Sequence, residues 1–164
     1  MAGQEYHARI GQVKIGSNGD QLQALVGSCI AIGFLHKDRP ICGLAHCLLP
    51  SSKSETFEIG ARYVDQAIHS LLQLMEVKPD ETRALRAILV GGGNMTKPED
   101  ANPRRLVGAN NAQFAKKTLR QKRIRIMHED LGGIHGRKIV IDTATNDFHV
   151  KAIPRIEEDC HAKK

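Results

Sequence analysis

Short apolar runs separated by turn signals dominate this sequence, and they limit its possible folds more than any other feature. Runs rich in Ile, Val, Leu and Ala and bounded by Gly, Pro, Asn or Asp are typical of β-strands. The predicted strands cover residues 8–16, 22–26, 30–35, 41–49, 85–90, 123–128, 138–142 and 148–153. Because many of these runs follow one another directly, the order favours an α+β fold with largely antiparallel or mixed sheets over a doubly wound fold.

Two segments have helical spacing instead. In the clearer one, residues 64–75, apolar residues form one continuous helical face. They are Val64, Ala67, Ile68, Leu71, Leu72 and Met75. The second segment, residues 109–122, has a weaker apolar stripe. We therefore expect two main helices, separated by the strand 85–90 and followed by a closing meander of three strands.

The length and composition fit one globular domain. The chain has 164 residues, of which 41% are hydrophobic and 26% charged, and this leaves little room for a second core. We assign residues 1–154 to the domain and predict a charged, disordered tail over residues 155–164.

Several features predict a cytoplasmic protein with reduced thiols. No run of about 18 apolar residues is present, so no membrane insertion is expected. The first residues lack the apolar segment of a signal peptide. The four cysteines are irregularly spaced, unlike those of a secreted disulfide scaffold.

The net charge of +6 is concentrated in a few basic clusters, at residues 104–105, 116–125 and 163–164. Such clusters attract acidic partners, whether nucleic acid or an acidic protein face, although they also occur on solvated helix surfaces. No aromatic platform or nucleic-acid motif accompanies them. A basic nucleic-acid-binding module is therefore a weaker hypothesis, and we expect no nucleic-acid partner.

Cys29 and His46 form the clearest candidate for chemistry. Cys29 follows the small turn Gly27-Ser28 and begins an apolar run, whereas His46 lies in the middle of the next run. If the two runs form a hairpin about residues 37 and 38, the two side chains lie nearly opposite each other. Histidine can then take the thiol proton and lower the thiol pKa, which suits nucleophilic attack on a carbonyl carbon. A buried structural cysteine and a satisfied core histidine are the plain alternatives.

Two other site types are considered and set aside. Cys42, His46 and Cys47 lie close in sequence, but alternation along a strand turns Cys47 away from the other two. Four converging ligands are missing, so no metal and no cofactor are expected. The run 91–94, Gly-Gly-Gly-Asn, lacks the frame of a phosphate-binding loop. It is better explained by close approach of the backbone beside a pocket.

Taken in chain order, these segments resemble the CheD family of bacterial chemoreceptor glutamine deamidases. The resemblance rests on residues 25–31 (LVGSCIA), 43–50 (GLAHCLLP), 62–67 (RYVDQA), 91–95 (GGGNM), 107–111 (VGANN), 129–133 (EDLGG) and 136–138 (GRK). The spacing from Cys29 to His46 also matches that family.

The resemblance implies a three-layer α/β/β fold and an activity. Cys29 would attack the carboxamide of selected glutamines on chemoreceptor cytoplasmic domains, with His46 as general base and acid. Backbone N–H groups near Ser28 and Cys29 would hold the oxyanion, with Gly27 supporting the turn. The pocket loop would include Gly92, Gly93, Asn94 and Asn111. A CheC-type phosphatase is an implied partner.

One position departs from the family pattern. Family members commonly carry threonine six residues before the nucleophile, as a third catalytic member, and this chain has Gln23 there. The Gln23 amide or its backbone carbonyl would then orient the His46 ring. The alternative is a catalytically weakened protein of the same fold that binds chemoreceptors or a CheC-type phosphatase.

Overall fold

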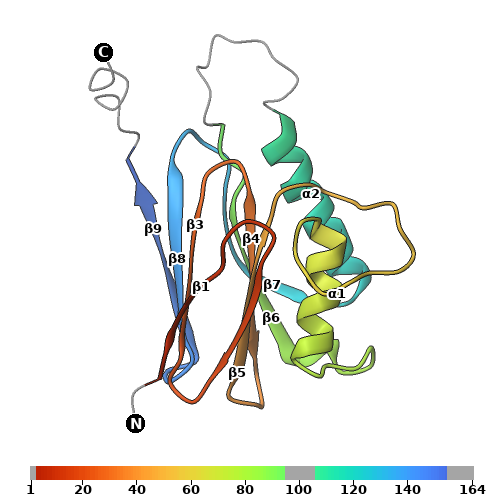
Figure 1. The fold of residues 1–164 in the computed structure, drawn as a ribbon, viewed down its shortest axis with the longest axis vertical. Helices are drawn as coiled ribbons and strands as arrows, with labels where there is room; N and C mark the ends of the chain where they lie inside the picture. The colour runs from red at the N-terminus through yellow and green to blue at the C-terminus, as the bar shows by residue number, and fades with distance from the viewer. Residues whose placement is uncertain (1–2, 95–105, 155–164) are drawn as a thin grey trace.

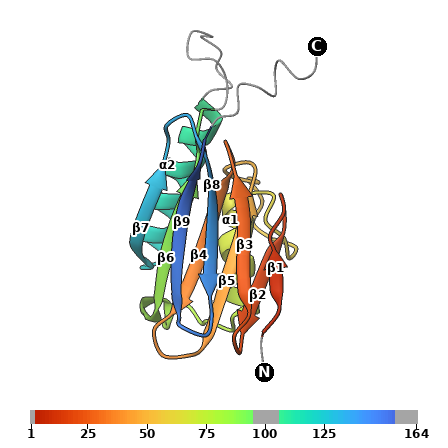
Figure 2. The same cartoon turned by 90° about the vertical axis from the view of Figure 1, so that its left-hand side faces the viewer.

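Two helices and two β-sheets stack as three layers in the computed structural model, which describes residues 3–94 and 106–154 (Figure 1). The expected tail 155–164 and residues 95–105 lie outside this range. The helices are α1 (Val64–Leu74) and α2 (Leu106–Gln121), and a short 3₁₀ helix covers Thr82–Ala84. Both helices lie on one face of the five-stranded sheet, and the four-stranded sheet covers the other face (Figures 1 and 2).

The two sheets are mixed. The four-stranded sheet has the order β1 (Glu5–His7), β3 (Gln21–Val26), β8 (Gly136–Asp142) and β9 (Asp147–Ile153). The five-stranded sheet has the order β2 (Val13–Ser17), β5 (Ile41–Cys47), β4 (Ile30–His36), β6 (Leu85–Gly91) and β7 (Arg125–Leu131). The pairs β1–β3 and β6–β7 are parallel and the others antiparallel. The predicted α+β class and α/β/β layering are therefore confirmed.

The predicted hairpin between the Cys29 and His46 segments is also confirmed. Strands β4 and β5 pair in antiparallel register, with Ala31 opposite His46 and Ile30 opposite Cys47. Cys29 lies two positions before Ala31, so this register puts it near the end of the hairpin, on the same face as His46. The hairpin thus brings the two candidate residues to one end of the sandwich.

The predicted closing meander is wrong. Strand β7 does not pair with β8 but runs parallel to β6, whereas β8 and β9 form a hairpin in the other sheet. Helix α2 connects β6 to β7, and a helical crossover is what a parallel neighbour requires. The order of short apolar runs does not reveal which sheet each run joins.

The single strand expected over residues 8–16 is divided in the structure. Strand β1 ends at His7 in the four-stranded sheet, and β2 begins at Val13 in the five-stranded sheet. Residues 8–12 form a crossing between the sheets, where Gly11 has a left-handed φ of 85°. Glycine adopts this conformation without the steric cost of a side chain.

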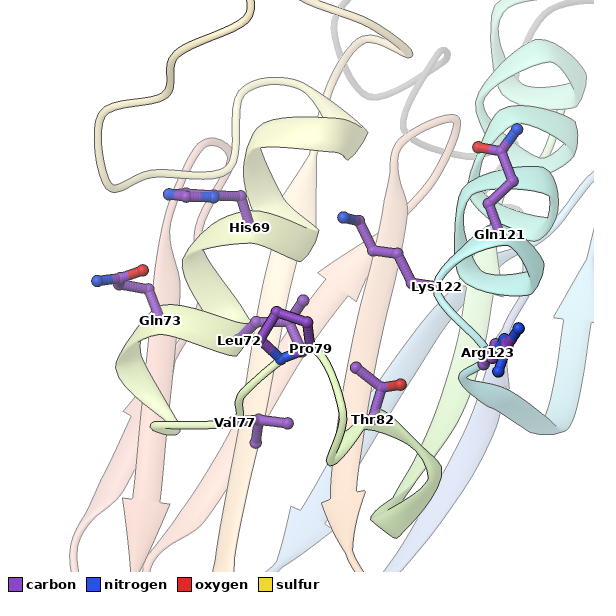
Figure 3. Close-up of a pocket in the computed structure, with 9 residues that line it drawn as sticks. All are labelled: His69, Leu72, Gln73, Val77, Pro79, Thr82, Gln121, Lys122 and Arg123. Atoms are coloured by element: carbon purple, nitrogen blue, oxygen red, sulfur yellow. The ribbon is translucent and has the colours of Figure 1, made fainter.

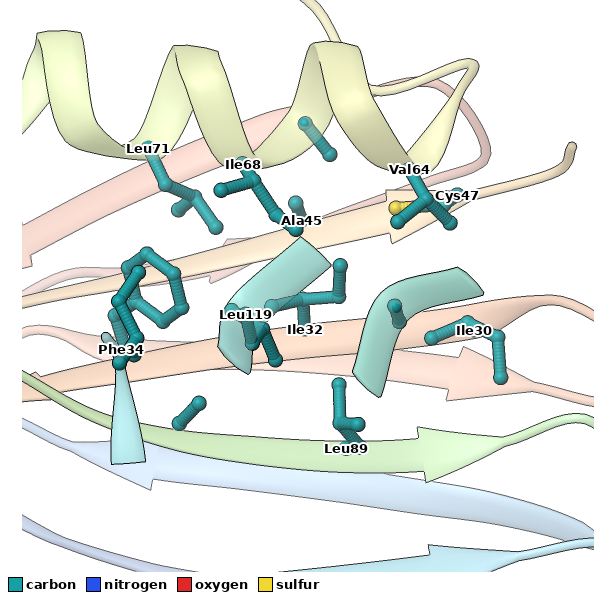
Figure 4. Packing of buried hydrophobic residues seen from close by; sticks show 14 of the residues in the cluster. Ile30, Ile32, Phe34, Ala45, Cys47, Val64, Ile68, Leu71, Leu89 and Leu119 are labelled. Carbon is teal, nitrogen blue, oxygen red and sulfur yellow. The ribbon is translucent and has the colours of Figure 1, made fainter. Parts of the chain in front are cut away.

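Alternation along the central strands fills two separate apolar layers. In β4, Ile30, Ile32 and Phe34 face the helices, whereas Ala31 and Leu35 face the four-stranded sheet. Figure 4 shows the first group packed against Ile68, Leu71 and their neighbours. All seven residues of β4 are buried, because this strand lies between two covered faces.

Helix α1 offers a matched test of this packing. Leu71 is fully buried against the five-stranded sheet, whereas Leu74 on the same helix is 40% exposed. We expect Leu71→Ala to lower the free energy of unfolding by about 2–5 kcal/mol, because it leaves a cavity. Leu74→Ala should cost less than about 1 kcal/mol. Urea denaturation measures both, and equal losses would contradict the assigned helix face.

Candidate active site

Cys29 lies in the turn where the chain passes from one sheet to the other. Residues 27–29 connect the end of β3, in the four-stranded sheet, to the start of β4 in the five-stranded sheet. The Cys29 side chain is 7% exposed and packs in the layer between the sheets. The thiol is therefore largely shielded from solvent, although the turn that carries it lies at the end of the sandwich.

The glycine run after β6 braces this turn. The Gly92 N–H donates to the Cys29 carbonyl oxygen at 2.9 Å, and the Gly93 N–H donates to the Gly27 carbonyl oxygen at 2.9 Å. A Cβ atom on Gly91, whose φ is 119°, would collide with the Cys29 carbonyl oxygen. These contacts fit the predicted close approach of the backbone. The glycine run packs directly against the Cys29 turn and bonds to it.

Arg137 and Gly108 hold the glycine run in turn. The guanidinium of Arg137, only 9% exposed, donates to the Gly91 carbonyl oxygen at 3.3 Å and forms an ion pair with Asp130. Gly108 of α2 approaches so closely that a Cβ there would lie 2.7 Å from the Gly92 carbonyl oxygen. The start of α2 and the facing ends of β7 and β8 are thereby tied to the Cys29 turn.

His46 is fixed by the crossing 8–12. Its Nδ1 atom lies 2.9 Å from the Ala8 carbonyl oxygen. Its backbone N–H donates to the Gln12 carbonyl oxygen at 3.1 Å, and its carbonyl oxygen accepts from the Gly11 N–H at 2.8 Å. A carbonyl oxygen can only accept, so Nδ1 carries the proton and Nε2 is left with a lone pair.

Cys29 and His46 face the same layer at the same end of the β4–β5 hairpin. His46 is 5% exposed and, like Cys29, borders the apolar cluster between the sheets. The described residues give no hydrogen bond between the thiol and the imidazole.

Burial sets the charge state of the pair. Desolvation raises the pKa of the Cys29 thiol above its ordinary value. Desolvation also lowers the pKa of His46, an effect partly offset by the hydrogen bond to Ala8. The direction is opposite to the expected lowering of the thiol pKa, because desolvation by burial disfavours the thiolate. At neutral pH the pair is a thiol beside a neutral imidazole.

Gln23 has other partners than His46. Its side-chain Nε2 donates to Glu5 at 2.9 Å, and its carbonyl oxygen accepts from the Ala8 N–H at 2.8 Å. Its neighbours Leu22 and Ala24 face the layer between the sheets, so Gln23 points to the opposite face of β3. The carbonyl that contacts the histidine ring belongs instead to Ala8.

The prediction of one strand over residues 8–16 does not indicate a role for Ala8. An alanine contributes only its backbone to this contact, so its side chain gives no chemical signal. The only signal available was indirect, because a buried histidine in an apolar strand requires a hydrogen-bond partner.

The other two pocket-loop residues have bracing contacts. The Asn94 N–H donates to the Gly133 carbonyl oxygen at 2.8 Å. Asn111, fully buried on α2, donates from Nδ2 to the Leu48 carbonyl oxygen at 2.9 Å, and its Oδ1 has no partner among the described residues. Asn111 thereby ties α2 to the segment that follows His46.

Cys42 and Cys47 lie apart from this chemistry. Cys42 contacts Asn146 at 3.6 Å, near the opposite end of β5, and burial raises its pKa to about 12. Cys47 faces the helix layer. Across residues 3–94 and 106–154, no three His, Cys, Asp or Glu side chains cluster closely enough to hold a metal ion. No helix in that part of the chain is long and apolar enough to cross a membrane.

Two cavities differ in their relation to the candidate pair. A cavity of about 430 Å³ is bordered by His46, Ala24, Leu25 and residues 7–10. A larger one, about 510 Å³, lies between the C-terminal ends of α1 and α2, where Leu72, Val77 and Pro79 line one side (Figure 3). His46 but not Cys29 lines the smaller cavity, and neither residue lines the larger one.

Comparison with known proteins identifies the family. The family model for CheD, described as chemotactic sensory transduction, matches residues 48–152. The chain belongs to the CheD family. It is 44% identical to a probable chemoreceptor glutamine deamidase CheD 2 of Ruegeria sp., over 93% of this chain and 94% of that protein. Proteins named probable chemoreceptor glutamine deamidase CheD from Bdellovibrio bacteriovorus and Methanococcus vannielii are 35% and 32% identical, over 92% and 87% of this chain and 96% and 92% of theirs.

The glycine brace gives a test of the Cys29 turn. We expect Gly91→Ala to lower the melting temperature and to change the rate of Cys29 alkylation, because the new Cβ displaces the Cys29 carbonyl. Gly132→Ala is the matched control, since Gly132 also has positive φ, 82°, but a Cβ there meets nothing within 4 Å. Mass spectrometry of the Cys29 peptide reports the alkylation rate. Equal effects of both variants would mean that backbone strain alone accounts for the change.

Proposed function

We propose that this chain is a protein-glutamine deamidase that converts selected glutamines of chemoreceptor cytoplasmic domains to glutamate. The observation that carries the proposal is the placement of Cys29 and His46 on one face of the β4–β5 hairpin, with the His46 Nδ1 bonded to Ala8. The relatives named as chemoreceptor glutamine deamidases support the substrate class. Such a substrate would place the protein in the cytoplasm.

The first half of the reaction forms a thioester. The Nε2 lone pair of His46 takes the Cys29 proton as sulfur attacks the carboxamide carbon. The developing oxyanion accepts hydrogen bonds from the amides of Ser28 and Cys29, which donate to no described residue in the free protein. The tetrahedral intermediate then expels the amide nitrogen, which takes the proton from His46 and leaves as ammonia.

The second half restores the enzyme. His46 removes a proton from water, the hydroxide attacks the thioester carbon, and the carbon–sulfur bond breaks. The thiolate recovers its proton from His46, and the substrate side chain leaves as glutamate. Ala8 keeps the ring in one tautomer throughout, the role that a triad's third member performs.

Deamidation of a chemoreceptor cytoplasmic fragment tests the proposal directly. Mass spectrometry should detect glutamine-to-glutamate conversion with the wild type. Cys29→Ala should abolish it, and His46→Ala should lower kcat/KM by roughly 10²–10⁴-fold, the usual contribution of general acid–base catalysis. Normal turnover by either variant would exclude the proposed pair.

Two control variants sharpen this experiment. Cys42→Ala removes a buried thiol at the far end of β5 and should keep activity. Gln23→Ala removes a side chain bonded to Glu5 and should keep kcat within about threefold, because a carbonyl of Ala8 orients His46. A loss as large as that of His46→Ala would return Gln23 to the catalytic set. If the wild type binds the fragment without converting it, the chain is a binding protein with the deamidase fold.

The pH dependence follows from the shifted pKa values. The active form is the thiol with neutral imidazole, so activity is lost when acid protonates His46. Because burial lowers the pKa of His46 below 6.5, this loss in kcat/KM should have its midpoint below pH 6.5. The thiol pKa lies above 9.0, so activity should stay flat from about pH 6.5 to that value. A midpoint well above 6.5 would indicate a different base or an imidazolium–thiolate pair.

A further inference from the structure

Two unusually exposed apolar side chains border the cavity that reaches His46. Leu25 is 61% exposed and Ile10 is 57% exposed, the highest values among the large hydrophobic residues that the structure describes. Leu25 belongs to β3 and Ile10 to the crossing 8–12, yet both line the cavity of about 430 Å³. Two separate segments therefore present apolar surface at the same opening.

The same opening carries positive charge. Arg9 lines the cavity with His7, and none of the described lining residues is acidic. Lys138 lies opposite Leu25 in the β3–β8 register and adds a second cation on that side of the sheet. The nearest carboxylate on β1, Glu5, accepts a hydrogen bond from Gln23. The rim of the cavity, formed by Arg9, Ile10 and Leu25, thus combines apolar contact with an attraction for acidic groups.

We propose that Ile10, Leu25 and Arg9 are specificity-determining residues that bind the substrate segment beside the target glutamine. This inference rests on the proposed deamidase function and names what that site selects. The segment it fits carries an apolar side chain, which packs between Ile10 and Leu25, and an acidic side chain, which pairs with Arg9. Large exposed apolar residues beside a functional cavity are typical of binding surfaces.

The position of the rim explains how recognition and chemistry are joined. Ile10 lies between Ala8, whose carbonyl holds the His46 ring, and Gly11, whose N–H holds the His46 backbone. A substrate segment seated on Ile10 therefore packs against the crossing that orients the general base. Binding energy from the rim is gained in the ground state and the transition state alike, so its loss raises KM more than it lowers kcat.

Kinetics on two substrates test the proposal. Leu25→Thr and Ile10→Thr should each raise KM for a chemoreceptor cytoplasmic fragment by about tenfold, with kcat within about twofold. Turnover of a glutaminyl dipeptide, too short to reach the rim, should stay unchanged. Met127→Thr is the matched control, because Met127 is 46% exposed on the distant edge strand β7. Unchanged KM in both rim variants would overturn the inference.

Charge reversal tests the acidic part of the segment. Arg9→Glu should raise KM for the fragment, and the effect should shrink as salt is added, since salt screens the pair. Lys78→Glu, an exposed cation near the 3₁₀ helix, should leave KM unchanged. Equal effects of the two reversals would show a general charge effect and remove Arg9 from the proposal.

A binding measurement separates this inference from the proposed activity. Fluorescence anisotropy of the labelled fragment gives Kd for wild type, Leu25→Thr, Ile10→Thr and Met127→Thr without any turnover. Weaker binding by the rim variants alone supports the rim, even if no glutamine is converted and the deamidase proposal fails. Equal Kd for all four proteins overturns the rim, even if the wild type is an active deamidase.

Discussion

The five-stranded sheet is covered on both faces, and the rest of the structure depends on this constraint. Helices pack on one face and the four-stranded sheet on the other, so each central strand must alternate between two apolar layers. A polar group in such a strand has no water to bond and must find a protein partner. His46 satisfies this requirement through the Ala8 carbonyl, and the partner that stabilises the ring also selects its tautomer.

The candidate chemistry lies where the chain leaves one sheet for the other. The turn 27–29 and the segment 8–12 are both crossings, and strands on each side hold their ends in place. Residues in such connections lie outside the regular strand pairing, so their backbone N–H and carbonyl groups can bond to the candidate residues. The Gly91–Gly93 run and the Ala8–Gln12 segment contribute backbone N–H and carbonyl groups to this support.

Electrostatics favour a neutral resting pair over a preformed thiolate. Burial raises the thiol pKa and lowers the imidazole pKa, and both shifts move the pair away from charge separation. The proton would then move only as sulfur attacks. In the proposed reaction, the resting thiol is a weak nucleophile until the Nε2 lone pair of His46 removes its proton.

Local signals in the sequence, namely periodicity and turn residues, were enough to predict the α+β class, the face of α1 and the β4–β5 hairpin. The sequence also indicated Cys29 and His46 as neighbours, since hairpin register follows from the turn. Tertiary structure alone decided that β7 joins β6 in parallel and that residues 8–12 cross between sheets. It also decided that Ala8, and not Gln23, contacts the histidine ring. Those outcomes depend on which distant strands pair and on backbone groups that every residue type has. Neither can be recognised from a local pattern of side chains.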